Sequence, residues 1–241
     1  MALFVVDTGQ DVVEANDGRL SLREAVAAAE SAAGADTIVF AEGLESVRID
    51  APLALSGAQR LTIDGDRDDD GLFDVTIDGR GRTKHFEIED RAVVELDGLS
   101  LVGGFDAGER AVGSIDNAGN LTLVRTLIDR SVAVGLDGAQ GEPGVDGAAG
   151  GRGRDGSLRT GRNGEDGGVG GDGGEGGVGE TGALAVGGVL NDSRGSLVLI
   201  DSAVGAAVDG LPGDGGQGGT GGRGGQGGDG GRGAGGVGSS A

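Results

Sequence analysis

Glycine recurs at every third position through two long stretches of this chain, and no other feature restricts the backbone as much. The first glycine leg runs from Gly135 to Gly156, and after residues 157–160 the second glycine leg runs from Gly161 to Gly182. Both legs contain the same number of period-three glycines, as the two arms of a hairpin require. A third glycine leg, Gly213–Gly236, has no return leg before Ala241, which favours a chain that is cut off or incomplete there.

The period of three has two regular solutions, collagen and a polyproline-II-like glycine helix. Collagen needs roughly 15–20% proline, but only Pro143 and Pro212 fall in the legs. A polyproline-II-like helix rises about 3.1 Å per residue and places every third residue on one face. The first leg has mainly one glycine face and the others are largely Gly-Gly-x, so we expect the first leg at the periphery of a small bundle. Flexible coil is the alternative, because ordering glycine costs conformational entropy.

Two similar segments, Ala111–Gly135 and Ala185–Gly210, each precede a glycine leg. Both read Ala-Val-Gly, then an Asn, a Gly and a run of alternating apolar residues. This repeat predicts stacked coils whose glycine legs leave at the same corner. Asn117 and Asn191 occupy the same place in the two copies, which predicts an asparagine ladder at a turn.

Short segments from residue 37 onward alternate β-branched or leucine residues with polar ones, the period of a strand. No crossover helices are predicted between them, so parallel pairing must come from coiling of the chain. A thin parallel β-helix also suits a chain with only five aromatic residues. The expected strands are Leu3–Asp7, Thr37–Phe40, Ser46–Asp50, Arg60–Asp64, Asp74–Asp78, His85–Glu89, Val93–Asp97 and Leu99–Val102.

One amphipathic helix is predicted at Leu22–Ala33. Ser21 with Glu24 three residues later forms a capping box, and Gly34 is a suitable stop. The first coil of a solenoid exposes its apolar end, and we expect this helix to cover it.

The segment NDGRLSLREAVAAAESAAGADTIVF, residues 16–40, resembles the N-terminal signature of bacterial right-handed parallel β-helix proteins with a Cys-Ser-Leu-Arg-Glu-Ala (CSLREA) motif. The motif is carried by Ser21–Ala25, and Leu20 stands where the family has cysteine. The resemblance extends over roughly Val5–Val208, the first glycine hairpin excluded. It implies an all-β, right-handed parallel β-helix on a bacterial surface or in a secreted protein.

The expected organisation has four parts. Residues 1–134 form the N-terminal cap and first coils, and residues 135–184 form a glycine-rich hairpin insert. Residues 185–209 add a further coil, and residues 210–241 begin a second insert or a truncated tail.

The formal charge of −21 argues against nucleic acid or an anionic membrane as partner. No stretch approaches the length of a membrane span, and the N-terminus lacks the basic and apolar regions of a secretory signal. We therefore expect an extracellular or cell-surface protein whose export signal lies elsewhere. Cysteine is absent, so the redox compartment is undetermined.

A calcium site is suggested by the pattern D-x-D-x-D-G-x-x-D, which begins at Asp66 and lies between the expected strands Arg60–Asp64 and Asp74–Asp78. Oxygen ligands at alternating positions with a glycine at the turn can surround Ca²⁺. An EF-hand would have Glu where this chain has Ile77, and a solvated acidic turn is the alternative. The candidate ligands are Asp66, Asp68, Asp70, the Leu72 carbonyl and Asp74.

Catalytic residues are harder to find. Asp64, Asp78 and Asp97 could align on adjacent coils, as carboxylates do in pectin-degrading β-helices, but each also fits a strand-ending Asp-Gly turn with a positive-φ corner. His85 is interpreted as a surface strand residue. Trp and Tyr are absent, so no aromatic wall for sugars is expected.

The sequence therefore favours a non-enzymatic, adhesin-like scaffold that contacts glycans or other surfaces. Two alternatives stay open: a polysaccharide lyase or glycoside hydrolase fragment, and an ice- or water-binding glycine bundle. The oligomeric state is not specified by any pattern in the chain.

Overall fold

The computed structural model describes residues 1–14, 17–68, 70–152, 169, 171–205, 209–223 and 226. The chain divides into two compact units. Unit one comprises Met1–Leu136 and Ala183–Gly213, and unit two comprises Asp137–Gly182 and Asp214–Ala241. The tip between the first and second legs and the end of the third leg lie outside the described residues.

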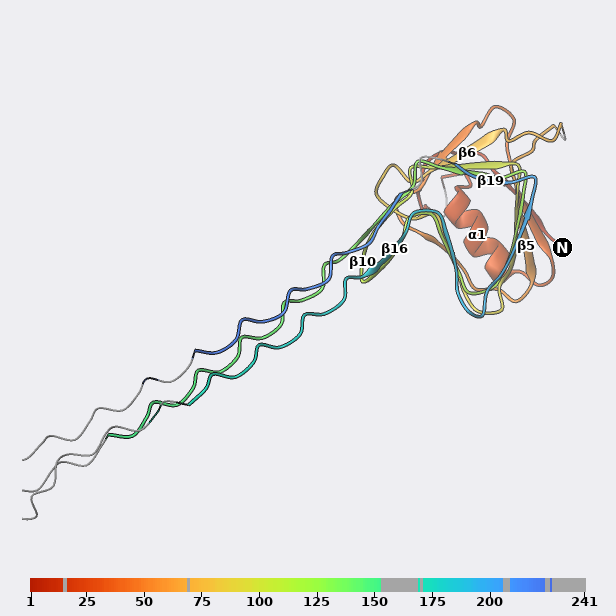
Figure 1. Cartoon of the computed structure of the whole chain (residues 1–241). Coiled ribbons are helices and arrows are strands. Elements are labelled where there is room, and N and C mark those ends of the chain that lie inside the picture. The colour runs from red at the N-terminus through yellow and green to blue at the C-terminus, as the bar shows by residue number, and fades with distance from the viewer. Residues whose placement is uncertain are drawn as a thin grey trace, which may run out of the picture. The chain divides into compact units, whose positions relative to one another are not determined.

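Unit one consists mainly of short strands in parallel sheets with one helix (Figure 1). The sheets have the orders β1-β2-β5-β8-β13-β18, β17-β12-β7-β4, β19-β14-β9-β6-β3, β10-β15-β20 and β11-β16. The strands are β1 (Leu3–Val6), β2 (Asp36–Phe40), β3 (Ser46–Arg48), β4 (Leu53–Leu55), β5 (Arg60–Asp64), β6 (Val75–Asp78), β7 (Phe86–Ile88), β8 (Val93–Asp97), β9 (Leu99–Val102), β10 (Phe105–Gly108), β11 (Arg110–Val112), β12 (Ile115–Asn117), β13 (Asn120–Val124), β14 (Leu127–Asp129), β15 (Val132–Gly135), β16 (Leu184–Val186), β17 (Val189–Asn191), β18 (Ser196–Ile200), β19 (Ala203–Val204) and β20 (Asp209–Leu211).

The chain enters these sheets in a repeating order. From β8 to β12 it passes through all five sheets, and β13–β17 and then β18–β20 repeat that order. The two similar segments found in the sequence therefore stack in register: Ala111 pairs with Ala185, and Leu121 pairs with Leu197. The described strands form five separate sheets rather than one closed sheet.

The core is a set of apolar columns that run from strand to strand. In one column Ile63, Leu96 and Leu123 are register neighbours on β5, β8 and β13, and all three are buried. The alternation of buried and half-exposed residues along these strands matches the period-two pattern of the sequence. Burying each such side chain stabilises the fold by about 1.5–3 kcal/mol.

Helix α1 (Leu22–Ser31) packs its apolar face against β1, β2 and β4, near the start of the stack (Figure 1). The predicted capping box is present: the Ser21 side chain accepts from the Glu24 N–H, and the Glu24 carboxylate accepts from the Ser21 N–H at 2.9 Å. The helix ends at Ser31 instead of Ala33, because the Ala32 N–H bonds to the Ala29 carbonyl and the chain turns extended there.

The strand-ending corners differ from the sequence expectation in detail. The left-handed residue follows the strand, at Gly98, Arg125 and Asp201 in three successive levels, with φ of 58°, 44° and 49°. Gly65 and Gly79 do not have positive φ. The Asp-Gly pairs therefore mark the corners correctly, but the conformation they were expected to share is carried in later coils by arginine and aspartate.

Both glycine arrays leave unit one from paired strands. The first leg follows β15 and the third leg follows β20, and Val134 lies beside Leu211 in that parallel pair. The second leg returns the chain to β16, which pairs with β11. The predicted common exit point is confirmed.

Unit two contains the three glycine legs, whose described parts are residues 137–152, 171–182 and 214–223. They run side by side as extended traces (Figure 1). Each leg donates backbone hydrogen bonds to one neighbour and accepts them from the other. The Gly141 N–H donates to Gln217 O at 2.7 Å, the Gly177 N–H to Glu142 O at 2.7 Å, and the Gly219 N–H to Gly177 O at 2.6 Å. The pattern repeats every three residues, so the legs are ordered as a hydrogen-bonded bundle.

One glycine face per leg is packed tightly inside this bundle. A Cβ added at Gly141, Gly176 or Gly219 would lie 2.1, 1.9 or 1.8 Å from a neighbouring carbonyl oxygen. Real Cβ atoms do not approach so closely, so these positions require glycine. The second glycine face of the third leg has room for a side chain, since a Cβ at Gly218 would lie 3.6 Å from its nearest neighbour, an ordinary contact.

The expected peripheral position of the first leg is therefore wrong. All three legs are hydrogen-bonded to both neighbours, so none of the described legs lies deeper than another. A three-leg bundle needs one glycine face per leg, which the first leg supplies. The second leg tolerates a side chain in its other glycine series, because Glu180 follows Gly177 there and still donates its N–H to Ala139 O at 2.9 Å.

Candidate functional site

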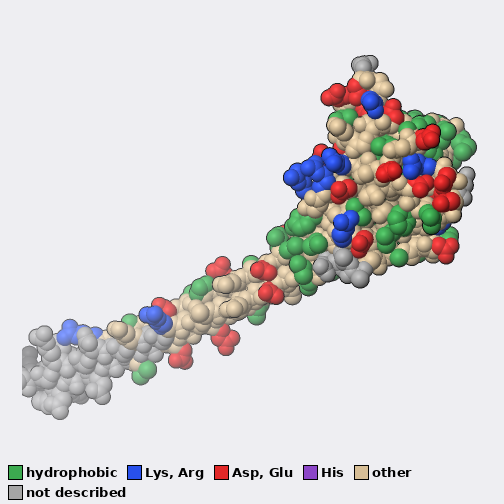
Figure 2. All heavy atoms as spheres, turned by 90° about the horizontal axis from the view of Figure 1, so that it is seen from above, with side chains coloured by type: hydrophobic (Ala, Val, Ile, Leu, Met, Phe, Trp, Pro, Cys, Tyr) green, Lys and Arg blue, Asp and Glu red, His purple; other side chains and the backbone are tan. Residues whose placement is uncertain are grey.

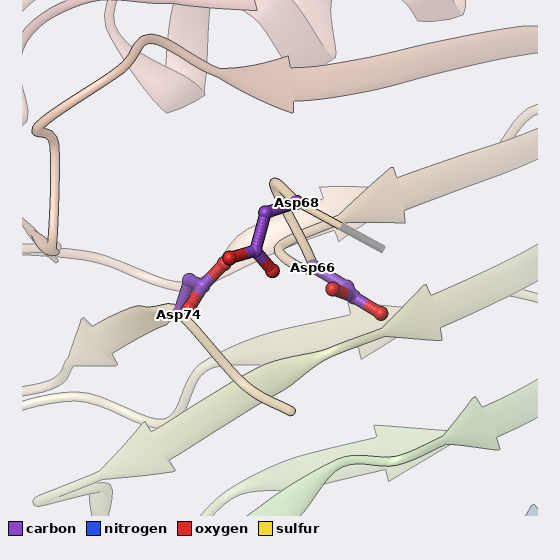
Figure 3. Close-up of side chains that lie close together, drawn as sticks. All are labelled: Asp66, Asp68 and Asp74. Carbon is purple, nitrogen blue, oxygen red and sulfur yellow. The ribbon is translucent and has the colours of Figure 1, made fainter. Parts of the chain in front are cut away.

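The loop between β5 and β6 gathers three carboxylates. Oxygen atoms of Asp66, Asp68 and Asp74 lie within 4.8 Å of one another. Figure 3 shows Asp68 pointing toward Asp74, with Asp66 beside them on the same loop. Asp66 is buried, Asp74 is half-buried and Asp68 is exposed. Three oxygens at these separations could hold a metal ion.

Backbone hydrogen bonds explain why the loop folds this way. Asp66 accepts from the N–H groups of Asp70 and Gly71, both at 3.1 Å, and Gly71 has a φ of 82°. Asp74 accepts from the Arg67 N–H at 3.0 Å, which closes the loop. Hydrogen bonds within the loop therefore fold it into a turn at Gly71, with the acidic side chains around that glycine.

The sequence-predicted ligands are only partly brought together. Asp66, Asp68 and Asp74 meet as expected, but Asp70 is not a member of this group. Its Oδ1 accepts from the Leu72 N–H at 2.9 Å instead. The Leu72 carbonyl stays a predicted ligand, and the Leu72 side chain is exposed on the loop.

Arg125 is a site residue that sequence reasoning missed. Its Nη2 lies 3.2 Å from Asp66 Oδ2 and 2.7 Å from Asp97 Oδ1, so one guanidinium joins the acidic loop to the end of β8. Burial raises the pKa of Asp97, although the Arg125 charge acts in the opposite direction. The arginine neutralises part of the cluster and competes with any metal for Asp66. Nothing in the sequence spacing points to this contact, because Arg125 is more than fifty residues from the loop.

The three aspartates considered for catalysis do not form one row. Asp64 and Asp97 are register partners on β5 and β8. Asp78 ends β6 in a different sheet, where Arg48 and Val102 are its neighbours. The expected alignment therefore holds for two of the three carboxylates.

His85 is buried, so its interpretation as a surface residue is wrong. Its Nε2 lies 3.0 Å from the Val102 carbonyl, which can only accept, so Nε2 carries the proton. Its Nδ1 lies 2.9 Å from Ser114 Oγ, which then donates to it. Burial lowers the pKa of His85 to about 4. The neutral ring is a satisfied core group that links separate coils, and both of its nitrogens are used in these contacts.

The predicted asparagine ladder is confirmed. Asn117 and Asn191 are register partners, and the Asn117 Nδ2 donates to Asn191 Oδ1 at 2.6 Å. The same amide also donates to Ser196 O at 3.1 Å, and its Oδ1 accepts from the Gly119 N–H at 3.1 Å. The side chain satisfies a buried turn, which is a structural role.

A groove of about 420 Å³ lies beside the acidic loop. Its apolar side is formed by Leu72 and Phe73, whose side chains are 62% and 49% exposed, and by Leu127. Arg125 and Asp201 supply charged groups to the same groove. An exposed aromatic ring next to charged side chains is suited to a ligand with both apolar and hydroxyl groups.

Unit two presents side chains of both charges along its legs (Figure 2). Asp137 and Asp146 each accept a backbone N–H of the third leg, at 2.8 and 2.7 Å. These carboxylates stand nine residues apart and fix the register of the first and third legs.

Among the described residues, no helix is both long enough and apolar enough to cross a membrane. Comparison of the chain with protein-family models, with curated proteins and with solved structures gives no match.

Proposed function

We propose that this chain is a non-enzymatic scaffold of the adhesin type, on a bacterial surface or secreted, with a right-handed parallel β-helix body. The repeating order of the sheets and the capped position of α1 support the β-helix. The sequence SLREA at Ser21–Ala25 supports a place among CSLREA-motif proteins. A role in binding other surfaces is inferred from the glycine legs that are attached to this β-helix body.

The observation that carries the proposal is the ordered glycine bundle. On each leg one backbone N–H in every three donates to a neighbouring leg, and the described non-glycine side chains are exposed. Such a module holds side chains at a three-residue spacing without needing a core of its own. It is a means of displaying groups to a partner, whereas catalysis requires convergent groups in a closed site.

The groove at Phe73 is the proposed contact for a glycan. Binding of the full chain to beads bearing alginate, pectin or dextran tests this, with Phe73→Ser as the variant. Val13→Ser is the matched control, since Val13 is also an exposed apolar residue. We expect retention on at least one polysaccharide, reduced at least tenfold by Phe73→Ser alone. Equal retention of both variants, or none by the parent chain, contradicts the groove assignment.

The enzyme alternative is tested in the same samples. Asp97 with its raised pKa, Asp64 beside it and Arg125 form the group that would be required. Release of unsaturated or reducing sugars from alginate or pectin, abolished in Asp97→Ala, would overturn the non-enzymatic proposal. We expect no turnover with or without Ca²⁺.

We also propose that the acidic loop binds calcium, because its three clustered donors are carboxylate oxygens, the ligands that Ca²⁺ prefers. Titration calorimetry with CaCl₂ should show one site, and saturation at a hundred times Kd should stabilise the fold by about 2.7 kcal/mol. Asp68→Asn should remove the binding, whereas Asp90→Asn, an exposed acid on another turn, should not. An absence of heat, or equal loss in both variants, refutes the site.

A further inference from the structure

The acidic loop between β5 and β6 carries parts of two sites. Its carboxylates at Asp66, Asp68 and Asp74 form the cluster that could hold a metal ion, and its Leu72 and Phe73 form the apolar side of the groove. These residues lie within one short stretch of backbone. A ligand at either site therefore acts on the backbone that forms the other.

Arg125 connects the same two sites from another coil. Its Nη2 lies 3.2 Å from Asp66 Oδ2 and 2.7 Å from Asp97 Oδ1, and the same side chain lines the groove. Gly71 lies beside the stem of this side chain, since a Cβ at Gly71 would lie 3.8 Å from Arg125 Cδ. The guanidinium therefore holds the acidic loop against the end of β8.

The backbone at Arg125 indicates that an arginine side chain is needed at this corner. Its φ is 44°, in the left-handed region that favours glycine, and the corner one level earlier has Gly98 with a φ of 58°. Non-glycine residues held in this region concentrate at ligand clamps and switches. In addition, the Arg125 Nε is buried and has no hydrogen-bond partner among the described residues. The contacts with the two aspartates thus leave part of the donor capacity of this arginine unused.

We propose, on the basis of the proposed calcium site and glycan groove, that Arg125 is a latch that calcium releases, and that the groove then takes an acidic glycan. Ca²⁺ and the guanidinium compete for Asp66, so a bound ion leaves Arg125 paired with Asp97 alone. The freed donors are then available to a carboxylate on a sugar in the groove. A carboxylate is the partner to which arginine donates two parallel hydrogen bonds.

The charge of the acidic loop determines the sign of this coupling. Residues 66–74 contain five aspartates and one arginine, so the loop repels an acidic sugar when no metal is bound. A bound Ca²⁺ adds two positive charges to the loop and reduces that repulsion. A neutral sugar experiences neither effect. Because coupling between two ligands is reciprocal, the acidic sugar must raise the affinity for calcium by the same factor.

Fluorescence anisotropy of labelled sugar oligomers tests the proposal with the full chain. The acidic probe is tetragalacturonate and the neutral probe is a four-residue dextran oligomer, each with excess CaCl₂ or with EGTA. We expect calcium to tighten the binding of tetragalacturonate by about tenfold and to leave the affinity for the neutral oligomer unchanged. Asp68→Asn removes an exposed calcium ligand and should abolish the calcium effect.

Arg125→Gln separates the latch from an ion that simply bridges the loop and the sugar. This variant should lose the calcium effect on tetragalacturonate. It should also bind calcium more tightly than the parent chain in calorimetry, because the competitor for Asp66 is gone. Arg91→Gln is the matched control, since Arg91 is also left-handed, with a φ of 72°, and its side chain is 84% exposed. The control should behave as the parent chain.

Calorimetry of the parent chain gives a readout that needs no variant. Calcium should bind about tenfold more tightly at saturating tetragalacturonate, after subtraction of a titration into the sugar alone. Independent binding of calcium and sugar, a calcium effect that persists in Arg125→Gln, or weaker calcium binding by that variant overturns the latch and leaves the two sites standing. Failure of both sugars to bind, or an absence of heat with calcium, overturns the latch together with the groove or the calcium site.

Discussion

Two adjacent glycines of the third leg should respond oppositely to alanine. A Cβ at Gly219 would lie 1.8 Å from Glu142 O, so Gly219→Ala must push the third leg away from the first. A Cβ at Gly218 would lie 3.6 Å from Gly177 O, an ordinary contact. Neither glycine has positive φ, so the backbone itself accepts alanine at both.

The magnitude follows from the bonds that separation would break. The Gly219 N–H donates to the second leg, and the first leg donates to Gln217 O and Thr220 O on either side. Three backbone bonds at about 1 kcal/mol each predict a loss of about 3 kcal/mol in local stability for Gly219→Ala. Gly218→Ala should instead stabilise by about 0.4–1 kcal/mol, because alanine restricts the unfolded chain.

Trypsin cleavage after Arg223 measures this local opening. Cleavage of a transiently opened segment tracks the population of the open state, so about 3 kcal/mol corresponds to roughly hundredfold faster cutting. We expect that increase in Gly219→Ala and equal or slower cutting in Gly218→Ala, followed by mass spectrometry. Similar rates in the two variants would refute the packing argument.

Three further predictions concern unit one. Because burial lowers the pKa of His85 to about 4 from 6.5, the unfolded chain takes up the proton first as pH falls. Its contribution to stability is present above pH 6.5 and is lost toward pH 4. Relative to His85→Gln, the parent chain should lose about 2 kcal/mol between pH 7 and 4.5 in urea unfolding; parallel pH profiles would contradict this. Ser21→Ala should cost about 1–2 kcal/mol by removing the helix cap, with Ser31→Ala, exposed in the last turn of α1, near zero in the same assay. Asn117→Ala should cost about 2–3 kcal/mol, since it leaves buried turn groups unpaired, and the exposed Asn191→Ala less than half of that; equal losses would refute the ladder's burial.

Much of unit one could be predicted from the sequence because its rules are local. The period-two alternation located β5, β8 and β9 at their observed bounds, and the capping box located the start of α1. The repeat of Ala-Val-Gly and Asn predicted the register of the last two coils. Strands without a clear alternation, such as β4 and β10, were not identified, because a three- or four-residue strand bonded to its neighbours needs little intrinsic preference.

The three-residue repeat of the glycine legs was predicted, and the hydrogen bonds between the legs follow it, but the arrangement of the legs was not predicted. The three-residue period determines which face of each leg consists of glycine. The number of legs that pack against each leg depends on how many legs are present. The Gly-Gly-x pattern suggested an interior position, whereas the third leg, which has that pattern, packs only one of its two glycine faces tightly.

The sequence predicted only the part of the candidate site whose residues lie close together in the chain. Asp66, Asp68 and Asp74 meet because one loop and its glycine turn bring them together. Arg125 arrives from another coil, and His85 is buried by strands that follow it in the chain. Contacts of this kind come from stacking, which a single sequence pattern does not specify.

Amide hydrogen exchange along the third leg, resolved residue by residue by NMR, tests the central claim most directly. The N–H groups of Gly216, Gly219 and Gly222 donate to the second leg, so they should exchange slowly. Those of Gly218 and Gly221 have no such acceptor among the described residues and should exchange quickly. A protection pattern with period three is the predicted result. Uniformly fast exchange through all of these glycines would contradict an ordered bundle.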